Sequence, residues 1–292
     1  MLSFLITGSE GQLGRCFHAV AQEFPQHQLI FIKKNFFDLT LPNTFDKVYQ
    51  IQPFDGIINC AAYTHVDKAE EESFLAKSIN VDGVKNIIDF AEKKDLSVIH
   101  FSTDYVFDGK TNIPYKEDYP IHPINFYGYS KYKGEEIVKN SKCLHTIFRL
   151  SWMFSPFGKN FVKTILRLSK TKDNIKVVND QHGRPTYGID LARTVLRNIS
   201  KPDFFDFNSY NYAMQGITTW FDFASKIISI KKSTCQIKSC LTSEYPTLAK
   251  RPKNSVLDTK RIENHLSLNI PSWEDSLKRC LKRIDNNEKI FI

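Results

Sequence analysis

The chain opens with a short apolar run, residues 2–7 (LSFLIT), that ends directly in a glycine-rich segment, residues 7–14 (TGSEGQLG). Apolar residues at helical spacing follow at once, which indicates a strand, a tight turn and a helix. Further apolar runs of strand length alternate with helical patterns, and they lie at 28–32, 55–62, 96–103 and 145–151. This alternation predicts an α/β fold in which helices cover both faces of a parallel sheet.

Three glycines, Gly8, Gly11 and Gly14, lie between the first expected strand and the first expected helix. Glycines at such a junction allow a tight turn, close approach of the backbone to a pyrophosphate and close packing of helix on strand, while the N–H groups of the helix start attract the anion. We therefore predict a Rossmann-like, NAD(P)-binding, doubly wound sheet. The spacing G-x-x-G-x-x-G differs from the G-x-G-x-x-G of most dehydrogenases. It resembles the extended branch of the short-chain dehydrogenase/reductase superfamily.

The second half of the chain has a less regular pattern. Segments with helical spacing at 160–170, 187–200 and 218–228 mix with loops rich in Pro, Thr and Asn. Loops beside a nucleotide-binding fold are suited to binding a substrate. We expect a Rossmann-like domain over 1–150 and a smaller, irregular C-terminal substrate-binding lobe over 151–292, with some segments of the lobe returning to the first domain.

Two lysines, Lys33 and Lys34, follow the second expected strand, where NAD-selective folds carry an acidic residue. Lysines at this point can pair with the 2′-phosphate of the cofactor, which favours NADPH over NADH. Two solvated surface lysines are the alternative.

Residues 125–133 (NFYGYSKYK) contain two overlapping copies of Tyr-x-x-x-Lys. Helical geometry places Tyr127 and Lys131 on one face, together with small and apolar residues, whereas Tyr129 and Lys133 lie on the opposite, polar face. The first copy also resembles the superfamily form P-x-x-x-Y-G-x-S-K. We therefore predict Tyr127 and Lys131 as catalytic residues and expect the second copy at the surface.

A free phenol has a pKa near 10 and is a poor acid at neutral pH unless a cation favours the phenolate. Lys131 is expected to supply that cation and to bind the nicotinamide ribose. Thr103, at the end of the fourth expected strand, matches the third catalytic position and would hydrogen-bond the reacting oxygen. In the run Thr103–Asp104–Tyr105 the Glu of nucleotide-sugar dehydratases is missing, which favours simple ketone reduction.

Several segments resemble the dTDP-4-dehydrorhamnose reductase family, in the same order and with similar spacing. They are AAYTHVDKAEEE, FSTDYVFDG, PINFYGYSKYKGE, FRLSWMFSPFGKNFVKTILRL, VVNDQHGRPTYGIDLA and RPKNSVLD. The resemblance implies that NADPH or NADH reduces the C4 ketone of dTDP-4-dehydro-L-rhamnose to dTDP-L-rhamnose, with Tyr127 as proton donor.

The resemblance also implies which residues contact the ligands. The expected cofactor contacts are Gly8, Gly11, Gln12, Leu13, Gly14, Lys33, Asp38, Leu39, Ala61, Ala62, Tyr63, Tyr127 and Lys131. The expected substrate contacts are Thr103, Asp104, Trp152, Asn160, Phe161 and Arg251. The planar fork of Arg251 suits a diphosphate, although a structural ion pair is the alternative. His100, within an apolar strand, is expected to be a core residue with its polar atoms satisfied.

Charge and composition restrict the remaining classes of protein. The net charge is +8, yet the basic residues are scattered, and nucleic-acid binding would require clustered basic and aromatic residues. No signal peptide or membrane-spanning apolar stretch is evident, and the six cysteines lack metal-ligand spacing. We expect a cytoplasmic protein that binds a nucleotide sugar, with no metal, no nucleic acid and no membrane; a homodimer is left open.

Two other functions remain open from the sequence. One is a reductase of another nucleotide-linked 4-keto-6-deoxy sugar, because the loops that recognise base and hexose vary. The other is a non-catalytic NADP-binding regulatory protein of the same fold, such as the regulatory subunit of methionine adenosyltransferase. The presence of Thr103, Tyr127 and Lys131 disfavours the second.

Overall fold

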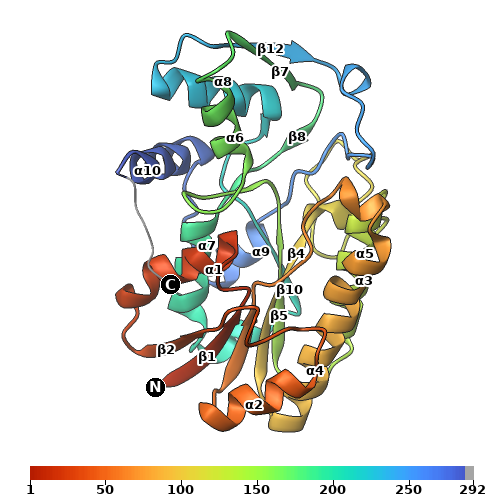
Figure 1. Ribbon diagram of the computed structural model, residues 1–292, viewed down its shortest axis with the longest axis vertical. Coiled ribbons are helices and arrows are strands. Elements are labelled where there is room, and N and C mark those ends of the chain that lie inside the picture. Colours follow the sequence, from red (N-terminus) through yellow and green to blue (C-terminus); the bar gives the residue numbers. More distant parts are fainter. Residues whose placement is uncertain (287–292) are drawn as a thin grey trace.

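The computed structural model describes residues 1–286, so residues 287–292 of the expected lobe lie outside the described residues. Its main sheet has six parallel strands in the order β10-β5-β4-β3-β1-β2 (Figure 1). The strands are β1 (Leu2–Thr7), β2 (His27–Phe31), β3 (Gly56–Asn59), β4 (Ser97–Thr103), β5 (His145–Leu150) and β10 (Ser209–Tyr212). The predicted α/β fold with a parallel sheet is confirmed.

Helices cover both faces of this sheet (Figure 1). On one face α1 (Gln12–Val20) packs against α7 (Gly188–Asn198). On the other face α4 (Gly83–Lys94) packs against α5 (Phe126–Lys139), and α2 (Asn43–Ile51) belongs to the same layer. Because both faces of the sheet are covered, the inner strands β3 and β5 are buried at every residue, which explains their continuous apolar runs.

The smaller lobe lies beyond the carboxyl edge of the sheet, at the top of Figure 1. There β7 (Asn174–Val178) and β12 (Gln236–Cys240) form a parallel pair beside α6 (Phe161–Leu168) and α8 (Trp220–Lys231). The remaining elements of the second half are β6 (Met153–Phe154), β8 (His182–Gly183), β9 (Thr186–Tyr187), β11 (Thr218–Thr219), α9 (Lys260–His265) and α10 (Trp273–Asp285). Strand β10 and helix α7 follow residue 150 in the chain but belong to the main sheet and to the helices that cover it. The division into a domain over 1–150 and a lobe over 151–292 stays a prediction.

The helical segment between β3 and β4, residues 73–94, is divided into three parts. A short α3 (Ser73–Lys77) is followed by a π-helical turn (Ser78–Asp82) and then by α4. The buried Asn80 lies in this turn, where its side chain binds both the N–H and the C=O of Tyr63 and also donates to Ser130. A π-turn of this kind often accompanies a functional site, and here it connects the loop after β3 with α5.

Helix α5 begins at Phe126. Asn125 caps it, because its side-chain oxygen accepts the N–H of Gly128 at 2.8 Å. The cap places Tyr127 in the first turn of the helix. Among residues 1–286, none of the helices has the length and apolar character that crossing a membrane requires.

Candidate active site

The carboxyl ends of β1, β3 and β4 meet at one edge of the main sheet. The strand order reverses between β1 and β3, since the chain moves from β1 to β2 on one side and then to β3 on the other. In doubly wound folds, ligands bind beside such a reversal, at the carboxyl ends of the strands. Most of the residues expected to contact the cofactor follow these strand ends.

The glycine turn has the geometry of a backbone cradle for an anion. Gly8 has φ +59, and a Cβ on it would lie 2.7 Å from the backbone nitrogen of Ala61. A Cβ on Gly14 would lie 2.4 Å from the carbonyl oxygen of Gly8. Helix α1 then starts without a side-chain cap, so its first N–H groups are available to a pyrophosphate. Gln12 donates to the carbonyl of Met153 at 3.3 Å.

A cavity of about 630 Å³ adjoins the glycine turn and the end of β2. Its lining residues are Glu10, Lys33, Lys34, Asn35, Asp38 and Leu41. Burial works against ionisation of Asp38, but two hydrogen bonds from Thr40 and the nearby Lys34 lower the pKa of this carboxyl. Two lysines and a carboxylate thus line the same cavity. The carboxylate suits the hydroxyls of a ribose, and the lysines suit a 2′-phosphate. The next residue, Leu39, is buried.

The loop after β3 runs beside the glycine turn. Ala61 donates its N–H to Asn59 at 3.2 Å, and Ala61 and Ala62 are partly buried. Tyr63 is buried, and its hydroxyl donates to Glu72 at 2.6 Å. Burial and this hydrogen bond raise the pKa of Tyr63 to about 12. Its phenol is therefore held as a neutral donor to the carboxylate.

Tyr127 lies next to the turn that follows β4. Burial raises the pKa of the Tyr127 phenol to about 12, while a hydrogen bond with Thr103 acts in the opposite direction. The Thr103 hydroxyl donates to Asp104 at 3.0 Å and accepts the N–H of Tyr105 at 3.2 Å. The rings of Tyr105 and Tyr127 meet edge to face, 5.9 Å apart. These contacts bring the predicted Tyr127, Thr103 and Asp104 together.

The Asp104 carboxyl is 3% exposed. Burial raises its pKa to about 7, although hydrogen bonds from Ser255 and Thr103 oppose this change. Near neutral pH the acid and the carboxylate form of this group are therefore both populated.

Lys131 is buried below the same strand ends. Its Nζ donates to the carbonyl of Phe101 at 2.6 Å and lies 3.5 Å from Nε2 of His100. Burial lowers the pKa of Lys131 to about 8, against the attraction of Glu135. Lys131 is thus mainly an ammonium at pH 7. Its expected effect on the pKa of Tyr127 stays a prediction.

The two faces of α5 differ as the helical periodicity predicted. Lys131 is buried and Tyr127 is partly buried, whereas Tyr129 is 46% exposed. Lys133 forms an ion pair with Glu136, at 2.6 Å, on the outer surface. The assignment of the inward face to the first Tyr-x-x-x-Lys copy is confirmed.

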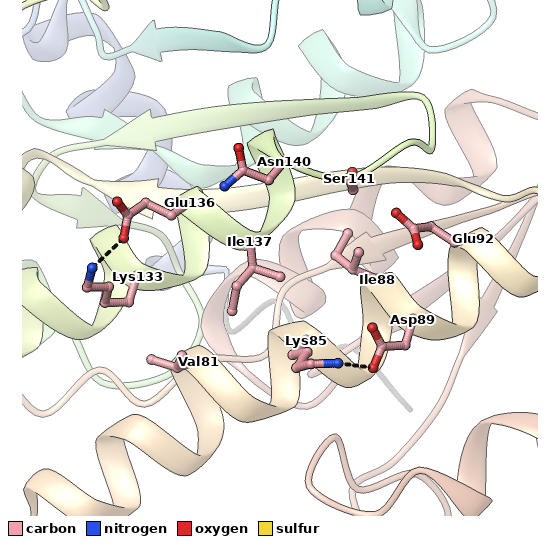
Figure 2. Close-up of a pocket in the computed structure, with 10 residues that line it drawn as sticks. All are labelled: Val81, Lys85, Ile88, Asp89, Glu92, Lys133, Glu136, Ile137, Asn140 and Ser141. Carbon is pink, nitrogen blue, oxygen red and sulfur yellow. Dashed lines mark hydrogen bonds and ion pairs between the residues drawn. The ribbon is translucent and has the colours of Figure 1, made fainter.

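A second cavity, of about 390 Å³, lies on that outer surface between α4 and α5 (Figure 2). Its cations are paired with carboxylates, Lys85 with Asp89 and Lys133 with Glu136. None of its lining residues is among the predicted catalytic, cofactor or substrate residues, so the cavity does not belong to the site at the strand ends.

Trp152 lies at the entry to the smaller lobe with an unusual backbone, φ +46. Its ring stacks on Trp220, with centroids 3.7 Å apart and planes at 10°. The ring of Phe161 lies 4.5 Å from Trp220. Trp220 was missed by the sequence analysis, because no local pattern connects it with Trp152.

The side chain of Asn160, another expected substrate contact, is hydrogen-bonded to the backbone of the loop before α6 and of the first turn of α6. Its oxygen caps α6 by accepting the N–H of Lys163 at 3.2 Å, and its nitrogen donates to the carbonyls of Ser155 and Phe157. These bonds shape the loop that follows Trp152.

Arg251 forms a two-pronged ion pair with Asp67, at 2.9 and 2.8 Å. Asp67 also accepts the N–H of Ala249, and the hydrogen bond from Arg251 lowers the pKa of this carboxyl. The ion pair that the sequence left as an alternative is therefore present. Asp67 was not predicted, since its partner lies far along the chain.

Within residues 1–286, no group of three or more His, Cys, Asp and Glu residues is arranged to hold a metal ion. The expectation of a metal-free protein stays a prediction.

The sheet is parallel and has a glycine turn after β1 and a threonine at the end of β4, and the next long helix carries a Tyr-x-x-x-Lys pair that faces inward. Together these features define an extended short-chain dehydrogenase/reductase. Comparisons with known proteins narrow this class. The sequence matches the family described as "RmlD substrate binding domain" over residues 2–286. A dTDP-4-dehydrorhamnose reductase of Aggregatibacter actinomycetemcomitans is 36% identical, over 95% of this chain and 98% of the relative.

Two solved structures share the whole fold. A dTDP-4-dehydrorhamnose reductase of Clostridium acetobutylicum has 36% identity and a TM-score of 0.92, covering 97% of this chain and 100% of the other. That of Bacillus anthracis, in complex with NADP, has 35% identity and a TM-score of 0.90, covering 97% and 99%. This chain belongs to the dTDP-4-dehydrorhamnose reductase family.

Proposed function

We propose that this chain reduces the C4 ketone of dTDP-4-dehydro-L-rhamnose to dTDP-L-rhamnose. The observation that carries the proposal is the contact between Thr103 and Tyr127 at the end of β4, with the buried Lys131 one helical turn further along α5, in a family whose similar members are named for this reaction. The reduced nicotinamide cofactor, when bound, supplies the hydride.

Each of the three side chains has a distinct task in this proposal. Tyr127 gives its proton to the ketone oxygen as negative charge develops there. The Thr103 hydroxyl donates to the same oxygen. Lys131, as an ammonium, orients the ribose and favours the phenolate that Tyr127 leaves behind.

The cofactor is inferred to be NADPH in preference to NADH. The cavity at the end of β2 contains Lys33 and Lys34, and lysines suit a 2′-phosphate. The similar structure from Bacillus anthracis is a complex with NADP. Gly8, Gly14 and the uncapped start of α1 would hold the pyrophosphate.

The nucleotide sugar is inferred to bind between the strand ends and the smaller lobe. Asp104 and Trp152 would contact the hexose, beside the loop that Asn160 and Phe161 shape. Arg251 would contact the diphosphate while Asp67 holds its guanidinium in place.

The proposal is tested by adding dTDP-4-dehydro-L-rhamnose to the protein with NADPH and measuring the fall in NADPH absorbance as the cofactor is oxidised. Tyr127→Phe is expected to keep cofactor binding and to lose most turnover, by roughly a hundredfold or more. Tyr129→Phe is the matched control, because the same change on the exposed face leaves the proton donor intact. Unchanged turnover in Tyr127→Phe would remove the proposed role of this phenol.

The identity of the sugar requires a second measurement. A panel of other nucleotide-linked 4-keto-6-deoxy sugars separates the proposed substrate from close relatives. NADP binding without turnover of any of them would favour a regulatory protein. The expected cytoplasmic location and a homodimer stay predictions, which cell fractionation and light scattering measure.

A further inference from the structure

A chain of buried polar groups crosses the ends of β1, β3 and β4 and reaches Lys131. The Thr7 hydroxyl donates to the side-chain oxygen of Asn59 at 2.7 Å, and the Asn59 nitrogen lies 3.1 Å from Nδ1 of His100. Nε2 of His100 lies 3.5 Å from Nζ of Lys131. All four residues are at most 2% exposed. The strand register places Asn59 beside both Thr7 and His100.

The hydrogen bonds of Asn59 determine which nitrogen of His100 carries a hydrogen. The Asn59 oxygen accepts from the Thr7 hydroxyl and from the N–H of Ala61, at 3.2 Å. The Asn59 nitrogen therefore faces His100 and donates to Nδ1. Because a neutral imidazole has a single N–H, this hydrogen is on Nε2, directed at Lys131.

Burial keeps this imidazole neutral. Burial and the neighbouring Lys131 hold the pKa of His100 well below its usual range, although Glu135 acts in the other direction. Glu135 is the carboxylate that attracts the Lys131 ammonium, but it is itself paired with Arg149 of β5 and with Lys139. Among these groups, the Lys131 ammonium therefore forms no ion pair with a carboxylate.

The direction of the Nε2 hydrogen affects the two forms of Lys131 differently. An ammonium has three donors and no acceptor, so an N–H that points at it is unfavourable. A neutral amine has a lone pair and can accept this hydrogen. Both forms can donate to the carbonyl of Phe101, which Nζ does at 2.6 Å.

We propose that His100 is a positioning residue whose Nε2 hydrogen weakens the hold of Lys131 on its proton and keeps Nζ directed at the Phe101 carbonyl. His100 touches Lys131 and acts through it, so its effect on the reaction rests on the proposed function. A buried imidazole with satisfied polar atoms is thereby assigned a task beyond packing.

The pH dependence of kcat/KM tests the effect on Lys131. His100→Gln keeps a polar side chain of similar reach, and its amide can turn the oxygen towards the ammonium. The basic limb of the profile is expected to move to higher pH by about one unit, a tenfold change in proton affinity. His145→Gln, a buried histidine of β5 bonded to Ser141 and Cys143, is the matched control with an unchanged limb. If kcat/KM falls at the same basic pH in His100→Gln and in the unaltered enzyme, the proposal is overturned.

A measurement on the unaltered protein does not depend on turnover. Nitrogen NMR of protein labelled in its eight histidines reports the protonation of each ring nitrogen. The His100 signals, assigned by their absence in His100→Gln or His100→Asn, are expected to show hydrogen on Nε2 and none on Nδ1 at neutral pH. Hydrogen on Nδ1 would contradict the inference about His100, whereas loss of reductase activity alone would count against the proposed function.

Discussion

Asp104 is the residue whose ionisation connects the site with the stability of the protein. It lies within hydrogen-bond distance of Thr103, which itself contacts Tyr127. Burial raises the pKa of Asp104 from 3.8 to about 7, so the folded chain holds a proton there that the unfolded chain releases at lower pH. A buried carboxyl beside the proposed proton donor can in this way affect both folding and chemistry.

The substitution Asp104→Asn should reveal this proton in unfolding experiments. Because the pKa is raised on folding, the stability that the group contributes is complete below about pH 4 and is lost as pH rises through about 7. Asp104→Asn should therefore gain stability relative to the unaltered protein between pH 4 and pH 8, by about 4 kcal/mol. Urea unfolding at the two pH values measures it.

Asp108→Asn is the control for this experiment, because hydrogen bonds from Lys110 and Tyr115 lower the pKa of Asp108 despite its burial. The stability that Asp108 contributes should be lost only as pH falls below about 4, so Asp108→Asn should differ from the unaltered protein by nearly the same amount at pH 4 and at pH 8. A difference between Asp104→Asn and the unaltered protein that does not depend on pH would contradict the raised pKa.

At the scale of elements, the position of α5 relative to β5 decides where Tyr127 and Lys131 lie. Glu135 of α5 and Arg149 of β5 form a two-pronged ion pair, at 2.9 and 2.7 Å, and both side chains are fully buried. Burial disfavours the charge on Glu135, but Arg149 lowers the pKa of this carboxyl to about 2. The pair holds the helix that carries the proposed catalytic residues against the sheet.

Removal of one partner of this pair should be costly. Arg149→Met leaves the buried Glu135 charge with only the partly exposed Lys139 as partner and should lower the free energy of unfolding by about 3–5 kcal/mol. Lys133→Met, which breaks the surface pair with Glu136 on the same helix, should have a far smaller effect. Chemical denaturation of the two variants measures the difference, and equal losses would contradict the role given to the buried pair.

The stack of Trp152 on Trp220 joins β6 and its preceding turn to α8. Trp220→Leu removes the stacked ring and should weaken binding of the nucleotide sugar, with a KM roughly tenfold higher. Cofactor affinity should stay unchanged, since the glycine turn is distant from α8 in the fold.

Circular dichroism gives an independent measure, because two indoles at 3.7 Å couple and a variant without the stack loses that signal. Trp273→Phe, which alters the third tryptophan, is the control. Loss of the coupled signal with an unchanged KM would show that the stack does not support substrate binding.

At the scale of the whole molecule, the last part of the chain returns to the loop after β3. The ion pair between Asp67 and Arg251 connects segments that are far apart in sequence, close to Tyr105. Strand β10 and helix α7 return in the same way to the main sheet and its cover. The two halves of the chain are thus joined by several separate contacts.

Single substitutions of Asp67 and Arg251 separate two tasks of this ion pair. If Arg251 binds the diphosphate, Arg251→Met should raise the KM for the nucleotide sugar about tenfold or more, with a smaller effect of Asp67→Asn. If the pair only joins the two halves, both variants should lose similar stability and keep their KM. Steady-state kinetics and urea unfolding together decide between these results.

Local patterns in the sequence were sufficient for the fold class and for part of the site. The strands follow from apolar runs, the cofactor turn from Gly8, Gly11 and Gly14, and the inward face of α5 from helical periodicity around Tyr127 and Lys131. Each of these depends on residues within a few turns or bonds of one another. Backbone sterics and the spacing of apolar side chains act over the same range, so the chain order alone determines them.

Only the tertiary structure decided which distant side chains meet. Trp220 stacks on Trp152, Asp67 pairs with Arg251, and His100 reaches the Lys131 ammonium because separate strands and helices pack together. Burial then changes the proton affinities of the side chains that it encloses. These pairings depend on how complete surfaces fit and exclude water, and no short stretch of the sequence contains that information.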